Sequence, residues 1–289
     1  MLERRPSVAL RASVSAAVIT AILVHVRVHI LTAGRSWREH TTETPITPAW
    51  WADGILQLTA FGLQLAAILY TWLPIGYSID QKKTVLVDTV ALPWTLYAAS
   101  LVAADLAHIA LGSGPRALTI TSLAGALAGF GALYGCLRKL HPLMVRLSRA
   151  EGAGTTQQRV KLVRTGTRWS TAYALFRLPT SASAALCCTR AGVDATAYAM
   201  TLTGTSLRDA LNPSLGLLCG VMVVAIIMLN HLDDLGFIIT VALWLLGLIM
   251  ATHTLLMVKC FTIALVMALA MRAAFKYVPD EDEVGEKRE

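Results

Sequence analysis

Ionisable side chains inside long apolar stretches are the residues of this chain best suited to chemistry. Such groups are costly at bilayer depth unless they are paired, line a cavity or lie near the interface. Asp88 and Asp105 share one stretch, and Lys259 lies in another, where a lysine could hold retinal with an aspartate as counterion. The segment around Lys259 lacks the aromatic residues that enclose a chromophore. The pattern therefore favours a lysine paired with Asp105, or one that reaches for the membrane surface.

Histidines form a second group of candidates. His25 and His29 are four residues apart and would share one helix face. Bis-imidazole haem ligation would need a partner such as His108 or His253 at matching depth on another helix. These four are the haem-ligand candidates, although histidines near the ends of spans more often bond to backbone or headgroups. No other cofactor is predicted, and no catalytic residue set converges in the sequence, so we expect no enzyme.

The cysteines do not predict a metal site. None of the five has metal-ligand spacing, and the adjacent pair 187–188 would point to different sides of a helix. We expect small apolar roles inside the spans for all of them: Cys136, Cys187, Cys188, Cys219 and Cys260.

An acidic cluster, His231, Asp233 and Asp234, could bind a metal or a diphosphate. Prenyl-transferring membrane enzymes need two aspartate-rich motifs so that magnesium ions can bridge the diphosphate, and the spans contain no second one. A polar turn between two helices is therefore the favoured interpretation.

The stretch from 170 to 200 is the most polar of the apolar series. Arg177 stands just before Pro179, and Arg190 and Asp194 follow further along. Proline removes a backbone donor and kinks a helix, so a bend at Pro179 could open a cavity there.

These residues lie on elements that composition assigns to a membrane. Hydrophobic residues make up 55% of the chain and charged residues 15%, with a mean hydropathy of +0.59. A span needs about 20 apolar residues, and runs without period-two alternation predict helices. The last apolar stretch is too long for one crossing, so we divide it near Thr252–Thr254. The predicted fold is an all-α, multi-pass transmembrane bundle of about eight helices, with seven as the alternative: 14–32, 49–73, 85–111, 117–137, 170–200, 214–230 and the two parts of 235–275.

Basic residues predict the orientation of this bundle. Residues 1–275 form a single transmembrane domain with a basic loop at 138–168, followed by a charged tail at 276–289. Lys and Arg in short loops stay on the cytoplasmic or matrix side. The net charge of +7 is thus a topological signal, and we expect no nucleic-acid partner. The loop residues expected to dock on headgroups or on a partner are Arg138, Lys139, Arg146, Arg149, Arg159, Lys161, Arg164 and Arg168.

The first residues indicate a compartment. The segment at 1–18 carries three arginines, three serines and one glutamate, the acid-poor style of an organellar transit segment. The alternative is that these arginines only anchor the first helix. We expect a mitochondrial inner membrane protein with the basic loop on the matrix side.

One family resemblance involves the second span. TPITPAWWA at 44–52 is similar to the Thr-Pro-Ala-Gly-Trp opening of long-form tryptophan-rich sensory proteins, relatives of the translocator protein. The stretches 70–74, 176–179 and 234–247 resemble helix ends of that family in the same order, so the likeness covers most of the chain. Leu56 and Ala60 stand where the family has aromatic residues. The resemblance implies binding of a tetrapyrrole or another apolar ligand.

Three classes of function remain open. The favoured one is a non-catalytic accessory subunit, packed by its apolar faces among the other membrane subunits of an organellar complex, with bound phospholipid. The second is a translocator-like protein for a tetrapyrrole or apolar ligand. The third is a transporter, or a retinal or haem protein, that uses its buried ionisable groups. The candidates for ligand or lipid binding are Trp50, Trp51, Asp105, Arg177 and Lys259.

Overall fold

The described part of the chain folds into a bundle of eight helical rods. The computed structural model describes residues 8–27, 44–73, 77–111, 115–152, 169–252 and 254–277, and this part of the chain contains no strand. The predicted all-α bundle is confirmed, including the division of the last apolar stretch after Met250. The rods are α1 (Val8–Val26), α3 (Trp50–Trp72), α4 (Tyr77–Leu111), α5 (Pro115–Gly152), the continuous α7 (Trp169–Ala172), η2 (Tyr173–Arg177) and α8 (Leu178–Thr203), then α9 (Leu211–Leu232), α10 (Leu235–Met250) and α11 (Leu256–Tyr277).

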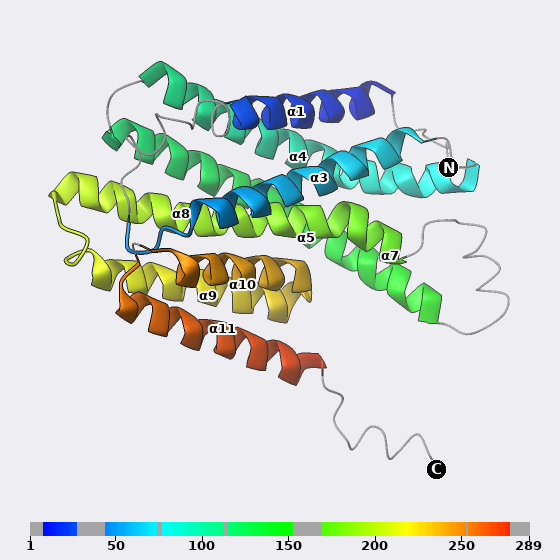
Figure 1. Cartoon of the computed structure of the whole chain (residues 1–289). Helices are drawn as coiled ribbons and strands as arrows, with labels where there is room; N and C mark the ends of the chain where they lie inside the picture. Colours follow the sequence, from blue (N-terminus) through cyan, green and yellow to red (C-terminus); the bar gives the residue numbers. More distant parts are fainter. Residues whose placement is uncertain are drawn as a thin grey trace, which may run out of the picture.

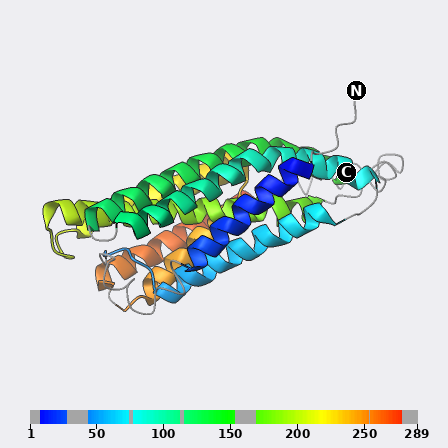
Figure 2. The same ribbon diagram turned by 90° about the horizontal axis from the view of Figure 1, so that it is seen from above.

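Successive rods run antiparallel along one common axis (Figures 1 and 2). Six of the described helices, namely α1, α3, α4, α5, α9 and α11, are long and apolar enough to cross a bilayer. The protein is therefore an integral, multi-pass membrane protein. We call the end at which α1 begins, α5 ends and α11 ends the basic end, and the opposite end the distal end.

Two helices extend further toward the basic end than hydropathy predicts. α5 continues to Gly152, beyond the predicted end of its span at 137, so Arg138, Lys139, Arg146 and Arg149 lie on a helix. α4 begins at Tyr77, eight residues before the predicted start of its span. Hydropathy marks where apolar residues end, whereas a helix can continue into water on residues such as Leu, Arg and Met. The other four docking candidates, Arg159, Lys161, Arg164 and Arg168, lie outside the described residues.

α8 is the central helix of the bundle (Figure 1). It contacts α3, α5, α9 and α10 and buries most of its residues, although its polar content keeps it out of the six apolar spans. Alanine, serine and glycine let backbones approach closely in membranes. At Gly129 of α5, an added Cβ would lie 3.2 Å from the Cys187 sulfur of α8 and 3.0 Å from the Ser100 hydroxyl of α4. Small residues thus hold three helices together around the bundle interior.

The TPITPAWWA segment packs at the distal end. The Ala49 N–H donates to the Gly247 carbonyl of α10 at 3.1 Å. A Cβ at Gly247 would lie 2.5 Å from the Cβ of Ala52, so only glycine fits this crossing of α3 and α10.

A charge cluster in the distal half of the bundle

A histidine and an aspartate meet in the interior between α1 and α4. The distance between His25 Nδ1 and Asp105 Oδ2 is 3.0 Å, and the two residues are only 7% and 2% exposed. The ring of Phe61 from α3 packs edge-on against the imidazole, with 5.5 Å between centroids. Asp105 is therefore paired with His25, and of the two alternatives for Lys259 the pairing with Asp105 is wrong.

A second polar group joins α5 to α8. The Ser122 hydroxyl donates to Asp194 Oδ2 at 2.6 Å, and Arg190 Nε donates to the Ser122 oxygen at 3.2 Å. Arg190 and Asp194 are also an ion pair one helical turn apart, with 3.7 Å between Nε and Oδ2. The serine thus bridges an arginine and a carboxylate at a helix crossing.

The two groups belong to one electrostatic cluster. Arg190 lies within electrostatic range of Asp105 and Asp53 as well as Asp194. Asp53, in the first turn of α3, is exposed and interacts electrostatically with both Arg190 and His25. We call these five residues, with Ser122, the distal charge cluster. It brings together side chains from α1, α3, α4, α5 and α8.

The charge balance of this cluster is negative. Among the six side chains of the cluster, the carboxylates of Asp53, Asp105 and Asp194 outnumber the one permanent cation, Arg190, and His25 can accept a proton. A carboxylate in a membrane is costly unless it is paired or lines a cavity, so an excess of carboxylates favours uptake of positive charge. The arrangement is chemically suited to holding a proton or a small cation.

Arg177 lies in a separate network near the basic end. It is 4% exposed, donates to the Leu232 carbonyl, and its guanidinium carbon lies 5.9 Å from the centre of the Tyr173 ring. The predicted kink at Pro179 corresponds to the π-helical turn η2 just before it, where the wider winding accommodates the proline.

The acidic cluster between α9 and α10 is a polar turn, as predicted. Asp234 caps α10 by accepting the Phe237 N–H at 3.1 Å, and it also accepts the Ser181 hydroxyl at 2.7 Å. Burial raises the pKa of Asp234 above its ordinary value, against the lowering effects of Arg177 and of these hydrogen bonds. Asp233 pairs with Lys276 of α11. Both carboxylates therefore have structural partners in the folded chain.

The remaining candidate residues do not join these networks. Trp51 is 39% exposed, Lys259 is half-buried on α11 and Asp88 is exposed on α4. His29 and His253 lie outside the described residues, and the side chains of Trp50 and His108 are not described. Among the described residues no group of three or more His, Cys, Asp or Glu is arranged to hold a metal ion.

Asp53 and Ser122 are the cluster residues that the sequence did not single out. An aspartate in the first turn of an apolar span is a usable signal for Asp53. Ser122 carries no such signal, because serine is common in membrane helices and its role depends on which helix it faces.

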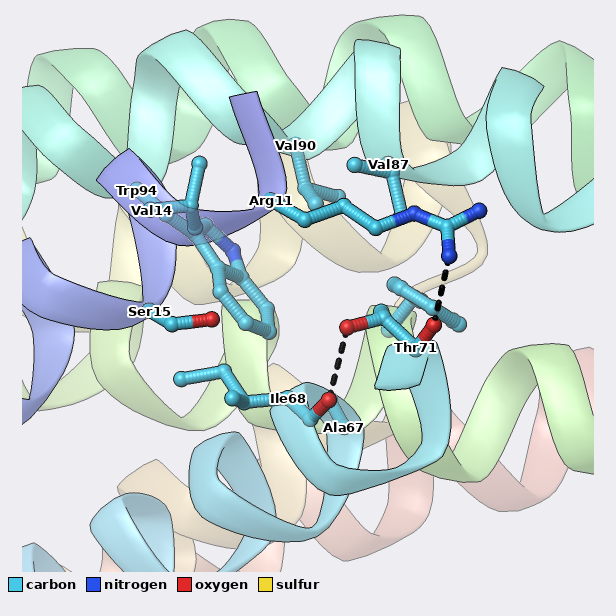
Figure 3. Close-up of a pocket in the computed structure, with 10 residues that line it drawn as sticks. Arg11, Val14, Ser15, Ala67, Ile68, Thr71, Val87, Val90 and Trp94 are labelled. Atoms are coloured by element: carbon cyan, nitrogen blue, oxygen red, sulfur yellow. Dashed lines mark hydrogen bonds between the residues drawn. The ribbon is translucent and has the colours of Figure 1, made fainter. Parts of the chain in front are cut away.

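A small cavity lies near the basic end, between α1, α3 and α4 (Figure 3). Its volume is about 20 Å³, which is room for one water molecule. Arg11 reaches along it and donates to the Thr71 carbonyl at 3.0 Å, while Trp94 forms part of its wall.

No family model, curated protein or solved structure matches this chain. The likeness to tryptophan-rich sensory proteins stays a prediction. What the protein does must be inferred from its own side chains.

Proposed function

We propose that this protein is a membrane transporter that moves a proton or a small cation by way of the distal charge cluster. The observation that carries the proposal is the buried His25–Asp105 pair, within electrostatic range of Arg190 in the interior of the bundle. Ionisable residues at membrane depth typically mark ion paths and proton relays, because a purely structural helix contact can be made at lower cost without them.

The proposed location is a mitochondrial inner membrane. The transit-like start of the sequence supports it, and the positive-inside rule would then place the basic end in the matrix. The distal charge cluster would face the intermembrane side, from which a proton or cation would enter.

Flux through reconstituted protein tests the proposal. Purified protein is placed in liposomes that contain a pH-sensitive dye, and a potassium gradient with valinomycin drives cation entry; radioactive sodium is tested in parallel. We expect faster entry of protons or of sodium than in protein-free liposomes. The proposal is wrong if neither ion enters faster.

An accessory subunit of a larger membrane complex is the second candidate. It is favoured by α11, which packs mainly along α10 and α9 and carries an exposed, sulfur-rich apolar face. Methionine is common at adaptable binding surfaces. The exposed residues are Met257, Cys260, Met267, Met271 and Phe275.

Native gel migration followed by mass spectrometry tests this second candidate. The protein is extracted in a mild detergent from its own membrane, and an accessory subunit is expected to migrate with stoichiometric partner subunits. Migration as a monomer carrying only phospholipid would contradict it.

A further inference from the structure

Polar side chains continue from the distal charge cluster into the middle of the bundle. We propose that the seam between α3, α4 and α8, formed by Gln57, Gln64, Tyr97, Thr180 and Ser183, is a pathway for water and protons from the distal charge cluster toward the cavity at the basic end. This inference rests on the proposed transport function and names a proton as the transported ion.

The distal part of the seam adjoins the cluster directly. Asp53 and Gln57 are four residues apart on α3 and share a helix face. Tyr97 of α4 is 2% exposed and lies near Gln57 and near Ser183 of α8. Three helices therefore present polar groups to one another, one turn below the exposed carboxylate of Asp53.

The middle of the seam is fully buried. Gln64 Nε2 donates to the Ser183 hydroxyl at 2.8 Å, and the two residues are 1% and 0% exposed. Gln64 follows Gln57 by seven residues, and Ser183 precedes Arg190 by seven, so each pair lies on one face of its helix. The polar faces of antiparallel α3 and α8 are thus matched along about 10 Å, at 1.5 Å per residue.

The seam approaches the cavity near the basic end through Trp94. Its indole N–H donates to the Thr180 hydroxyl at 3.0 Å, and its ring lines the cavity beside Thr71 and Arg11 (Figure 3). Arg11 Nε is buried and has no hydrogen-bond partner among the described residues. A water molecule in the cavity would satisfy it.

The chemistry of the seam selects water and protons over larger solutes. Hydroxyl groups and amides can both donate and accept hydrogen bonds, as a chain of water molecules requires. The cavity, at about 20 Å³, admits one water molecule and no larger solute. The competing interpretation is that these hydrogen bonds only fasten helices together, as polar residues do in many membrane bundles.

Cysteine accessibility in reconstituted liposomes separates the two interpretations. In a full-length protein whose native cysteines are replaced by alanine, Gln57→Cys and Gln64→Cys are compared with Leu58→Cys. Leu58 is the matched control, because it lies on α3 beside Gln57 and is 49% exposed on the outer surface of the bundle. A membrane-impermeant thiol reagent is added from either side; it reacts with the thiolate, which forms in water and not in lipid.

We expect labelling of Gln57→Cys, at the distal mouth of the seam, and no labelling of Leu58→Cys. Gln64→Cys, in the part of the seam that only water can enter, should stay unlabelled by the reagent. If Gln57→Cys is protected as fully as Leu58→Cys from both sides, the pathway is refuted. Gln57 is half-buried and tolerates cysteine, so its result stands even if Gln64→Cys fails to fold. If the protein conducts ions but Gln57→Cys is not labelled, the pathway is refuted and the transport function stands. If Gln57→Cys is labelled but the protein conducts no ions, the transport function is refuted.

Discussion

Replacing Asp105 separates the structural role of the His25–Asp105 pair from its role in carrying charge. Asp105→Asn removes the charge but keeps an oxygen that can accept the hydrogen bond from His25. Asp105→Ala removes both. Asp88→Asn and Asp88→Ala are the matched controls, because Asp88 lies on the same helix, is exposed, and makes no hydrogen bond or ion pair among the described residues.

The expected losses in the free energy of unfolding follow from burial and hydrogen bonding. Asp105→Ala leaves the His25 ring nitrogen buried without its partner, which costs about 1–3 kcal/mol. At about 2–4 °C per kcal/mol, the unfolding midpoint should fall by several degrees. Asp105→Asn should lower it much less, because the hydrogen bond survives. Neither Asp88 variant should change stability by more than about 0.5 kcal/mol.

Thermal unfolding in detergent, followed by tryptophan fluorescence, measures these differences. We expect the midpoint of Asp105→Ala to lie clearly below those of Asp105→Asn and of both Asp88 variants. Equal midpoints for Asp105→Ala and Asp88→Ala would refute the buried pair. Equal losses in Asp105→Asn and Asp105→Ala would show that the charge itself stabilises the fold.

Two further predictions concern helix crossings. Ser122→Ala removes the 2.6 Å hydrogen bond to Asp194 and should lower the free energy of unfolding by about 1–3 kcal/mol. Ser206→Ala, at an exposed turn, should lower it by less than about 0.5 kcal/mol. Equal effects in the same melting assay would contradict the bridge between α5 and α8. Gly247→Ala places a methyl group 2.5 Å from a carbon of α3 and should lower the free energy of unfolding by about 1–3 kcal/mol. Gly216→Ala, with open space around it, should leave that free energy unchanged or raise it. A Gly247→Ala protein as stable as the wild type would show that α3 and α10 cross differently.

Hydropathy predicted the helices well because the membrane imposes a length and a composition on each span. It also placed the break in the last stretch, where Thr252–Thr254 interrupt the apolar run. It could not predict the extension of α5 past Arg138, since a helix that leaves the bilayer no longer needs apolar residues. The boundaries of spans are therefore better predicted inside the membrane than beyond it.

The contacts within the distal charge cluster could not be predicted from the sequence. The sequence marks both His25 and Asp105 as unusual, but the pairing of two residues 80 positions apart depends on how α1 and α4 rotate about their axes. Spacing along one helix predicts which residues share a face and not which helix that face meets. Arg177 and Asp105, grouped as ligand-binding candidates, in fact lie in separate networks of the bundle.

Proton flux through the Asp105 and Asp88 variants tests the central claim most directly. Matched liposomes containing wild type, Asp105→Asn or Asp88→Asn are driven by the same potassium gradient, and acidification of the entrapped dye is recorded. The distal charge cluster predicts that wild type and Asp88→Asn conduct alike, while Asp105→Asn falls to the rate of protein-free liposomes. Unchanged flux in a folded Asp105→Asn protein would contradict the claim that this cluster carries the transported charge.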